Sequence, residues 1–256
     1  DSFVFTRLLK IYEAHGANVL NLSKGVRGLA VFENSILKDY FVHNKGNLKF
    51  TEQPKQEVSK DVQGPQRYKK LAALMRHYSQ DLESYSVVEV GTWNGGRAIE
   101  MALAAFDNVN KFHYRGFDLF EQATDETDKE ELNVKAHNSL AAVEERLTKF
   151  AAMMKENGKE FTFRLIAGNT RDTMKGVRFD DVDFAYIDGG HSYETVKSDY
   201  SFLTHVPVVV FDDYYSTQDE KGIPEEHQGV IKVFKDVPNK RKKILSSEDR
   251  TAFGGV

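Results

Sequence analysis

The sequence of 256 residues contains no cysteine. This excludes disulfide bonds, thiolate metal sites and cysteine nucleophiles together, and it suits a reducing compartment. Long apolar runs are also missing, because the longest clear run, residues 206–211, is far shorter than the roughly 20 residues that cross a bilayer. No segment has the pattern of a secretory signal. We therefore expect a cytoplasmic protein with no membrane partner.

The sequence also lacks an excess of positive charge, and its formal net charge at pH 7 is -4. A dedicated nucleic-acid binder is usually basic, so we expect no nucleic-acid partner. One basic run, residues 240–243, directly follows Pro238 and Asn239. A solvated turn is the favoured interpretation of this run, ahead of a phosphate-binding patch.

What the chain does contain is enough apolar material for a large core, with 40% hydrophobic and 12% aromatic residues. Residues 1–80 show helical spacing at 3–12 and 66–78 and no long alternating segment. We predict that residues 1–80 form an N-terminal helical extension, which would cap a main domain at residues 81–256.

Short apolar runs alternate with helical patterns from about residue 85 onward. The runs end in polar or acidic residues and cover 87–90, 112–117, 161–167, 182–187 and 206–211. The helical patterns cover 96–106, 139–156, 193–203 and 229–237. This alternation predicts the α/β fold class, with a Rossmann-like, mostly parallel sheet and helices on both faces. Ligands of such sheets bind at the carboxyl ends of the strands.

A long connection interrupts this alternation, and we predict a helical insertion at about residues 120–157. Its first part, residues 121–138, is acidic and then mixed in charge. Connections of this length often serve as lids or binding loops. A solvated helical insertion explains the same residues equally well, so both interpretations stay open.

A glycine-rich turn, E-V-G-T-W-N-G-G at residues 89–96, follows the first strand and opens a helix. Glycines permit a tight turn and close approach of a ligand, and the free N–H groups of a helix N-terminus bind anions. Asp118 ends the second strand, at a spacing suited to an acid that binds ribose hydroxyls. The turn alone fits a plain connection, but the turn and Asp118 together predict a cofactor site.

The pattern E-x-G-x-x-x-G resembles motif I of class I S-adenosylmethionine-dependent methyltransferases, and the aromatic residue at its centre resembles the catechol O-methyltransferase group. The resemblance covers about residues 85–256 and implies S-adenosylmethionine as the cofactor. It implies that the methionine end is lined by Glu89, Gly91, Thr92, Trp93 and Gly95. It places the ribose and adenine near Asp118, Leu119, Asn169, Thr170 and, at the border of the cofactor, Asp188.

Three acids, Asp188, Asp212 and Asp213, follow the fourth and fifth strands. Neighbouring parallel strands would bring these carboxylates to one edge of the sheet, where they repel each other. An all-oxygen set suits Mg²⁺, Ca²⁺ or Mn²⁺, whereas a helix cap and a hydrated turn are the plain alternatives. The acids resemble the metal ligands of catechol, caffeoyl-CoA and macrocin O-methyltransferases. That resemblance implies a divalent cation, most plausibly Mg²⁺, on all three acids.

His191 lies three residues after Asp188, where the catechol and caffeoyl-CoA types carry a catalytic lysine. An imidazole is suited to proton abstraction near neutral pH, so we predict that His191 is the general base. A hydrogen-bonded structural histidine is the plain alternative. The predicted reaction is divalent-metal-assisted methylation of a hydroxyl on a small molecule such as a catechol, a sugar or a polyketide.

The sequence leaves three other functions open. A metal-independent methyltransferase could act on nitrogen or on a macromolecule. A nicotinamide-dependent oxidoreductase would explain the glycine turn and Asp118, but it leaves the acids and His191 without a role. A binding module that kept the fold is the third, because fold does not imply function. Assembly into a homo-oligomer also stays open.

Overall fold

A computed structural model describes residues 26–33, 66–131, 133, 135–216, 228–236 and 242–250 of the chain. The helix predicted at residues 3–12 lies outside these ranges, so that prediction stays a prediction. The described residues include every residue that the sequence assigns to the cofactor site, the metal site or the base.

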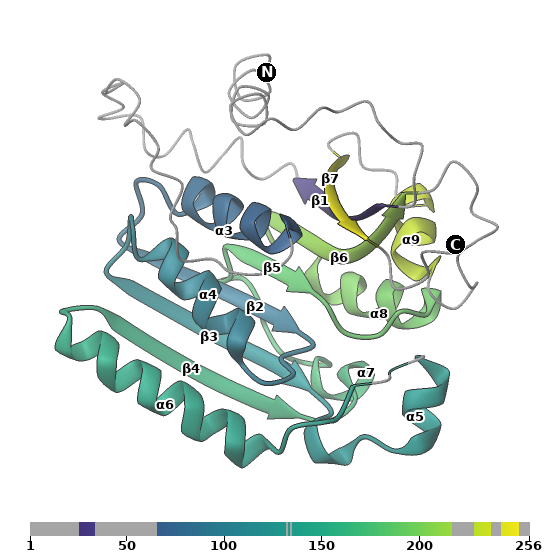
Figure 1. Cartoon of the computed structure of the whole chain (residues 1–256), viewed down its shortest axis with the longest axis horizontal. Coiled ribbons are helices and arrows are strands. Elements are labelled where there is room, and N and C mark those ends of the chain that lie inside the picture. The colour runs from purple at the N-terminus through teal and green to yellow at the C-terminus, as the bar shows by residue number, and fades with distance from the viewer. Residues whose placement is uncertain are drawn as a thin grey trace.

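The centre of the fold is a seven-stranded sheet with the order β4-β3-β2-β5-β6-β1-β7 (Figure 1). Strands β2 to β6 run parallel, and β1 is antiparallel to both of its neighbours, β6 and β7. This confirms the predicted Rossmann-like, mostly parallel sheet. The strands are β1 Val26–Glu33, β2 Ser84–Val90, β3 Lys111–Asp118, β4 Glu160–Ala167, β5 Phe184–Ile187, β6 Val208–Ser216 and β7 Lys242–Arg250.

Helices cover both faces of the sheet, as predicted. Helices α3, α4 and α6 pack on one face, and α7, α8 and α9 lie on the other (Figure 1). A short 3-10 helix, η1, and helix α5 lie in the connection between β3 and α6. The helices are α3 Gln66–Tyr78, α4 Gly96–Ala105, η1 Phe120–Gln122, α5 Asp125–Glu130, α6 Leu140–Glu156, α7 Thr170–Thr173, α8 Tyr193–Leu203 and α9 Gly229–Asp236.

The central strands are apolar on both faces, as expected for parallel strands covered by helices. Val87 and Tyr186 face the core cluster beneath α3, α4 and α6. Val88 and Ile187 face the cluster beneath α8 and α9. Successive side chains of a strand point to opposite faces of the sheet, so each central strand is anchored in both core clusters. This anchoring fixes where the carboxyl ends of the strands lie.

Helix caps fix the loops that enter three of the helices. The Ser139 hydroxyl accepts from the N–H of Ala142 at the start of α6. The Ser192 hydroxyl caps α8, and Thr124 forms a capping box with Thr127 at the start of α5. Such caps typically contribute about 1 kcal/mol each. Two of them, at Thr124 and Ser192, anchor the ends of segments that meet at the carboxyl edge of the sheet.

The two ends of the chain depart from the sequence-based expectation. The region predicted to form a helical extension contributes β1, in which Leu29 and Ala30 are fully buried. Leu29 belongs to one core cluster and Ala30 to the other, so the strand is apolar toward both faces there and lacks the alternation we searched for. Lys242 and Lys243, expected in a solvated turn, instead begin β7.

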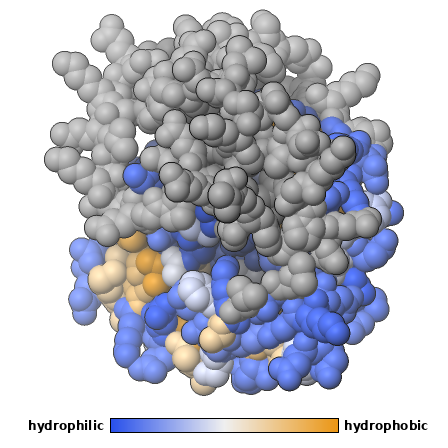
Figure 2. Space-filling model, turned by 45° about the vertical axis from the view of Figure 1, so that its right-hand side comes forward, coloured by the Kyte–Doolittle hydropathy of each residue, from blue (hydrophilic) through white to orange (hydrophobic). Residues whose placement is uncertain are grey.

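The described surface is mostly hydrophilic in the view of Figure 2, with smaller apolar patches. Among the described residues, no helix combines the length and apolarity that a membrane span requires. The large apolar side chains that are exposed are Trp93, Leu103, Met153, Val177 and Ile244.

Candidate functional site

The glycine turn between β2 and α4 is shaped by its neighbours as well as by its own backbone. Gly91 has a φ of +89°, and a Cβ atom there would lie 2.2 Å from the carbonyl oxygen of Asp188. Gly95 has a φ of +75° and precedes α4, where a Cβ would press on Val143 and Leu147. The positive φ angles favour glycine at both positions, and the backbone of Asp188 excludes a side chain at Gly91.

Asp118 is fixed at the rim of this turn by two backbone amides. The N–H of Trp93 donates to Oδ2 at 2.7 Å, and the N–H of Phe120 donates to Oδ1 at 2.8 Å. Trp93 and Phe120 both have positive φ angles, so the peptide units that hold the carboxylate adopt an unfavourable conformation for non-glycine residues. Each carboxylate oxygen keeps a second lone pair, which a ribose hydroxyl can use.

Glu89 and Thr92 lie beneath the turn instead of at its rim. Glu89 is fully buried and accepts a hydrogen bond from the hydroxyl of Tyr114. The Thr92 hydroxyl lies 3.2 Å from the same phenol oxygen. Burial raises the pKa of Glu89 to about 8, although the hydrogen bond from Tyr114 opposes the shift. These two side chains support the turn from below.

The predicted adenine-side residues lie at the same edge of the sheet. The N–H of Gly168 donates to the carbonyl of Asp118 at 2.9 Å, which ties the end of β4 to the end of β3. Asn169 caps α7 by accepting from the N–H of Arg171. Leu119 is half-buried and precedes η1, and Thr170 begins α7.

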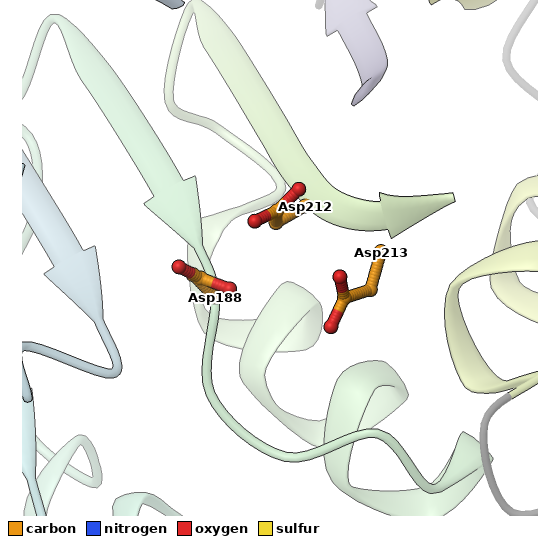
Figure 3. Close-up of side chains that lie close together, drawn as sticks. All are labelled: Asp188, Asp212 and Asp213. Atoms are coloured by element: carbon orange, nitrogen blue, oxygen red, sulfur yellow. The ribbon is translucent and has the colours of Figure 1, made fainter. Parts of the chain in front are cut away.

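Asp188 directly follows β5, and Asp212 and Asp213 lie within β6, just after its pairing with β5 ends at Phe211; the three acids meet there (Figure 3). The strand predicted to end at residue 211 therefore continues to Ser216. Each offers an oxygen atom that lies within 4.8 Å of the others. Asp212 and Asp213 are 1% and 4% exposed, and Asp213 has a φ of +57°. Non-glycine residues with such angles often lie at functional sites. The predicted convergence of the three acids is confirmed.

Arg67, which the sequence analysis missed, pairs with this acidic cluster. Its Nε lies 3.1 Å from both carboxylate oxygens of Asp212, and the residue is only 6% exposed. The guanidinium also lies over the ring of Tyr68, 4.2 Å from the ring centroid. Burial, followed by the charges of Asp188 and Asp212, raises the pKa of Tyr68 to about 12. No local pattern distinguishes Arg67 from an ordinary polar residue near the start of an amphipathic helix.

His191 is hydrogen-bonded through both ring nitrogens. Nε2 lies 2.8 Å from Oδ2 of Asp213, and Nδ1 lies 2.7 Å from the backbone carbonyl of Glu131. Burial lowers the pKa of His191, but the hydrogen bond and charge of Asp213 outweigh it and raise the pKa to about 9. His191 is therefore protonated at neutral pH in this state. Its role as a base stays a prediction that requires loss of this proton.

Glu131 joins the long connection to the loop that carries His191. Its carboxylate accepts from the backbone N–H groups of His191 and Ser192, at 2.6 and 2.8 Å, and from the hydroxyls of Ser192 and Thr195. A Cβ at position 190 would lie 2.7 Å from this carboxylate, so Gly190 makes room for it. Burial raises the pKa of Glu131, but these hydrogen bonds prevail and the net shift is downward.

The same connection also contacts the glycine turn. Nε1 of Trp93 donates to the carbonyl of Ala136 at 3.0 Å, and the Trp93 side chain is 47% exposed. The segment that sequence analysis left open between a lid and a solvated insertion thus contacts both the turn and the His191 loop. Glu131 was missed because one acid among several in this acidic segment carries no distinguishing signal.

Comparison with known families identifies the domain that holds these residues. Residues 88–214 match the family model of a methyltransferase domain. This range contains the glycine turn, Asp118, His191 and the three acids. Residues 88–214 are a class I S-adenosylmethionine-dependent methyltransferase domain. This domain class binds S-adenosylmethionine, and α3, β1 and β7 lie outside the matched range.

Three solved structures that are similar to this chain are distant from it in sequence. MNMC2 from Aquifex aeolicus is 9% identical over 71% of this chain and 58% of its own, with a TM-score of 0.37. S-adenosylhomocysteine-bound PaMTH1, a methyltransferase from Podospora anserina, is 11% identical over 77% and 63%, with a TM-score of 0.35. This chain therefore spans less than two thirds of the length of either protein.

A third structure matches along nearly the whole length of both chains. It is a Staphylococcus aureus protein with the provisional name caffeoyl-CoA O-methyltransferase, 13% identical over 95% of this chain and 98% of its own, with a TM-score of 0.43. No curated protein matches the sequence. The TM-scores are low, so the assignment to the methyltransferase family depends on the family model.

Proposed function

We propose that the methyltransferase transfers the S-adenosylmethionine methyl group to a hydroxyl of a small molecule with the help of a divalent cation, Mg²⁺ being the best candidate. The observation that carries this proposal is the meeting of Asp188, Asp212 and Asp213 beside the cofactor turn. Gly91 of that turn packs directly against the carbonyl of Asp188. A hydroxyl held at the acids would therefore lie close to the cofactor.

The donor set fits a hard cation. The three carboxylates have oxygens within 4.8 Å of one another, and two of them are buried, so they repel each other. Arg67 lies beside Asp212, and His191 lies beside Asp213. Oxygen-only sites of this kind favour Mg²⁺, Ca²⁺ or Mn²⁺. When bound, the cation would supply Lewis acidity that lowers the pKa of the acceptor hydroxyl.

The chain's own residues provide position and proton transfer in this proposal. Asp118 would orient the ribose, and the N-terminus of α4 would face the methionine carboxylate. After loss of the proton that faces Asp213, His191 would accept the hydroxyl proton at Nε2. Since the sulfonium methyl is already activated, holding the oxygen in line with it is the main task of the protein.

A second candidate, metal-independent methyl transfer, is favoured by one specific observation. Arg67 is paired with Asp212, and His191 is paired with Asp213, so two of the acids already have a cation. The acids would then serve to hold Arg67 and His191 in place. Sensitivity to chelator distinguishes this reaction from the metal-assisted one.

The test begins with calorimetric titration of the full chain with S-adenosylhomocysteine, for which we expect saturable micromolar binding. Methyl transfer to a panel of catechols, sugars and polyketides is then measured with EDTA, and again after excess Mg²⁺ is restored. Activity that disappears with EDTA and returns with Mg²⁺ supports the proposal. Full activity in EDTA would leave only the metal-independent reaction.

A further inference from the structure

Arg67 occupies the position of a counter-ion at one ligand of the proposed cation site. We infer that Arg67 is a built-in cation that competes with the divalent ion for Asp212, so that helix α3 sets the affinity of the site for metal. This inference rests on the proposed function. It adds to the site a residue from outside the matched domain of residues 88–214.

The contact between Arg67 and Asp212 is buried and close. The two side chains are 7% and 0% exposed, and Nε lies 3.1 Å from both carboxylate oxygens. Water therefore screens this pair poorly, and charges at short range interact strongly. A divalent ion on Asp212 would have to bind against the charge of the guanidinium or displace it.

Arg67 is also held from its other side. Its Nη2 donates to the hydroxyl of Tyr68 at 2.7 Å, and its guanidinium lies over the Tyr68 ring. The same ring lies 3.2 Å from the guanidinium carbon of Arg97, which belongs to the first turn of α4. Arg67 thus keeps its place through α3 and α4 as well as through Asp212. The guanidinium is a preorganised part of the site.

The charges of the cluster give the direction of the effect. The guanidinium of Arg67 offsets one carboxylate charge of the cluster, that of Asp212. Its removal makes the cluster more negative by one charge, which attracts a divalent ion more strongly. We expect the dissociation constant for the ion to fall at least tenfold in such a variant.

The experiment measures binding of Mn²⁺ alone to the full chain by electron paramagnetic resonance. Arg67→Met removes the charge, Arg67→Gln removes it but keeps a hydrogen-bond donor, and Arg67→Lys keeps the charge. Arg76→Met is the matched control, since Arg76 lies on the same helix and pairs with the exposed Asp107. We expect tighter Mn²⁺ binding in the Met and Gln variants, and binding within about twofold of wild type in the Lys and Arg76 variants.

Two results would overturn the inference while leaving the proposed cation in place. One is measurable Mn²⁺ binding to wild type that Arg67→Met and Arg67→Gln leave unchanged. The other is an equal gain in Arg67→Lys, which would trace the effect to geometry and not to charge. If neither wild type nor any variant binds Mn²⁺ at millimolar concentration, the cation-assisted function fails together with the inference.

Folding of each variant is checked by thermal melting and by S-adenosylhomocysteine titration, because removal of Arg67 leaves a buried carboxylate without its ion pair. If Arg67→Met does not fold, Arg67→Gln decides the comparison.

Discussion

The site has two halves that are built in different ways. The cofactor half consists of the turn at residues 89–96 and Asp118, and the acidic half consists of Asp188, Asp212 and Asp213 with Arg67 and His191. In the cofactor half, the N–H of Trp93 reaches Asp118 over 25 positions of the chain, within one strand-helix-strand unit. In the acidic half, Arg67 reaches Asp212 over 145 positions, and Glu131 reaches His191 over 60. The cofactor half is therefore a local product of the fold. The acidic half depends on segments that only the complete tertiary structure brings together.

The largest effect is expected when the acidic half alone is broken. Asp212→Asn removes a carboxylate charge from the cluster and leaves the guanidinium of Arg67 without its ion pair. We expect metal-stimulated methyl transfer to fall at least a hundredfold, on the order of the transition-state stabilisation that one charged group supplies. S-adenosylhomocysteine affinity, measured by calorimetry, should stay within about threefold. Asp107→Asn, an exposed acid, is the control.

Removal of the predicted base should likewise impair the acidic half and leave the cofactor half intact. His191→Ala is expected to cut turnover by roughly a hundredfold, the usual scale of general-base catalysis, with little change in cofactor affinity. Wild-type activity should rise with pH, since a base acts only after its proton is lost. A pH–rate profile of wild type and variant checks this. Unchanged turnover in the variant would show that His191 has a structural role alone.

The converse change breaks the cofactor half. Asp118→Ala removes the carboxylate that Trp93 and Phe120 hold in place. S-adenosylhomocysteine affinity should fall roughly tenfold to a hundredfold, as expected for lost hydrogen bonds to a charged group. Mn²⁺ binding at the acidic cluster should remain as in wild type. Parallel loss of both ligands would mean that the halves are not separable.

Glu131 tests how the connection between β3 and α6 supports the acidic half. Glu131→Ala removes the acceptor for the N–H groups of His191 and Ser192. Turnover should drop about tenfold because the loop loses its position. Glu131→Gln, whose amide oxygen can still accept from both N–H groups, should restore most of it. Hydrogen exchange at residues 191–192 should accelerate in the alanine variant and stay slow in Glu130→Ala, an exposed neighbour.

The smallest effect on function is expected at Asp199, which is fully buried in α8 behind the acidic half. Burial raises its pKa from 3.8 to about 7, against the lowering effect of Thr170. The unfolded chain therefore releases this proton at lower pH than the folded protein does. Asp199 contributes its full stability below about pH 3.8, and this contribution is lost as pH rises toward 7.

Asp199→Asn should remove the cost of burying a charged carboxylate above about pH 7. We expect the variant to be more stable than wild type by about 1–3 kcal/mol at pH 8, with a smaller difference at pH 4.5. Urea unfolding at the two pH values measures it, and turnover should change little. A gain of the same size at both pH values would trace the effect to packing and not to ionisation.

The difference between the halves also explains how much the sequence could predict. The turn at Gly91 and the acids Asp118, Asp188 and Asp212 each come directly after an apolar run of the sequence, which is a local pattern. Helix periodicity likewise predicted the bounds of α3 and α8. Whether the predicted residues bind the ligands assigned to them stays a prediction.

Residues that act through distant contacts were not predictable. Arg67 and Glu131 are single charged residues in segments rich in charge, and only their tertiary partners distinguish them. Strand β1 was missed because its apolar run is covered on both faces and is flanked by regions with helical spacing. Strand β7 was missed because it begins with basic residues that are typical of a turn.

The place of β1 in the sequence determines when the sheet can be completed during synthesis. β1 leaves the ribosome before every other described strand, yet its partners β6 and β7 are the last two. The buried residues Leu29 and Ala30 must wait for the strands that cover them until residues 208–250 have been synthesised. Until β1 docks, β6, with Asp212 and Asp213, is an open edge that can pair with another nascent chain. Completion of the acidic half is therefore a late event in biosynthesis, after the cofactor half has emerged.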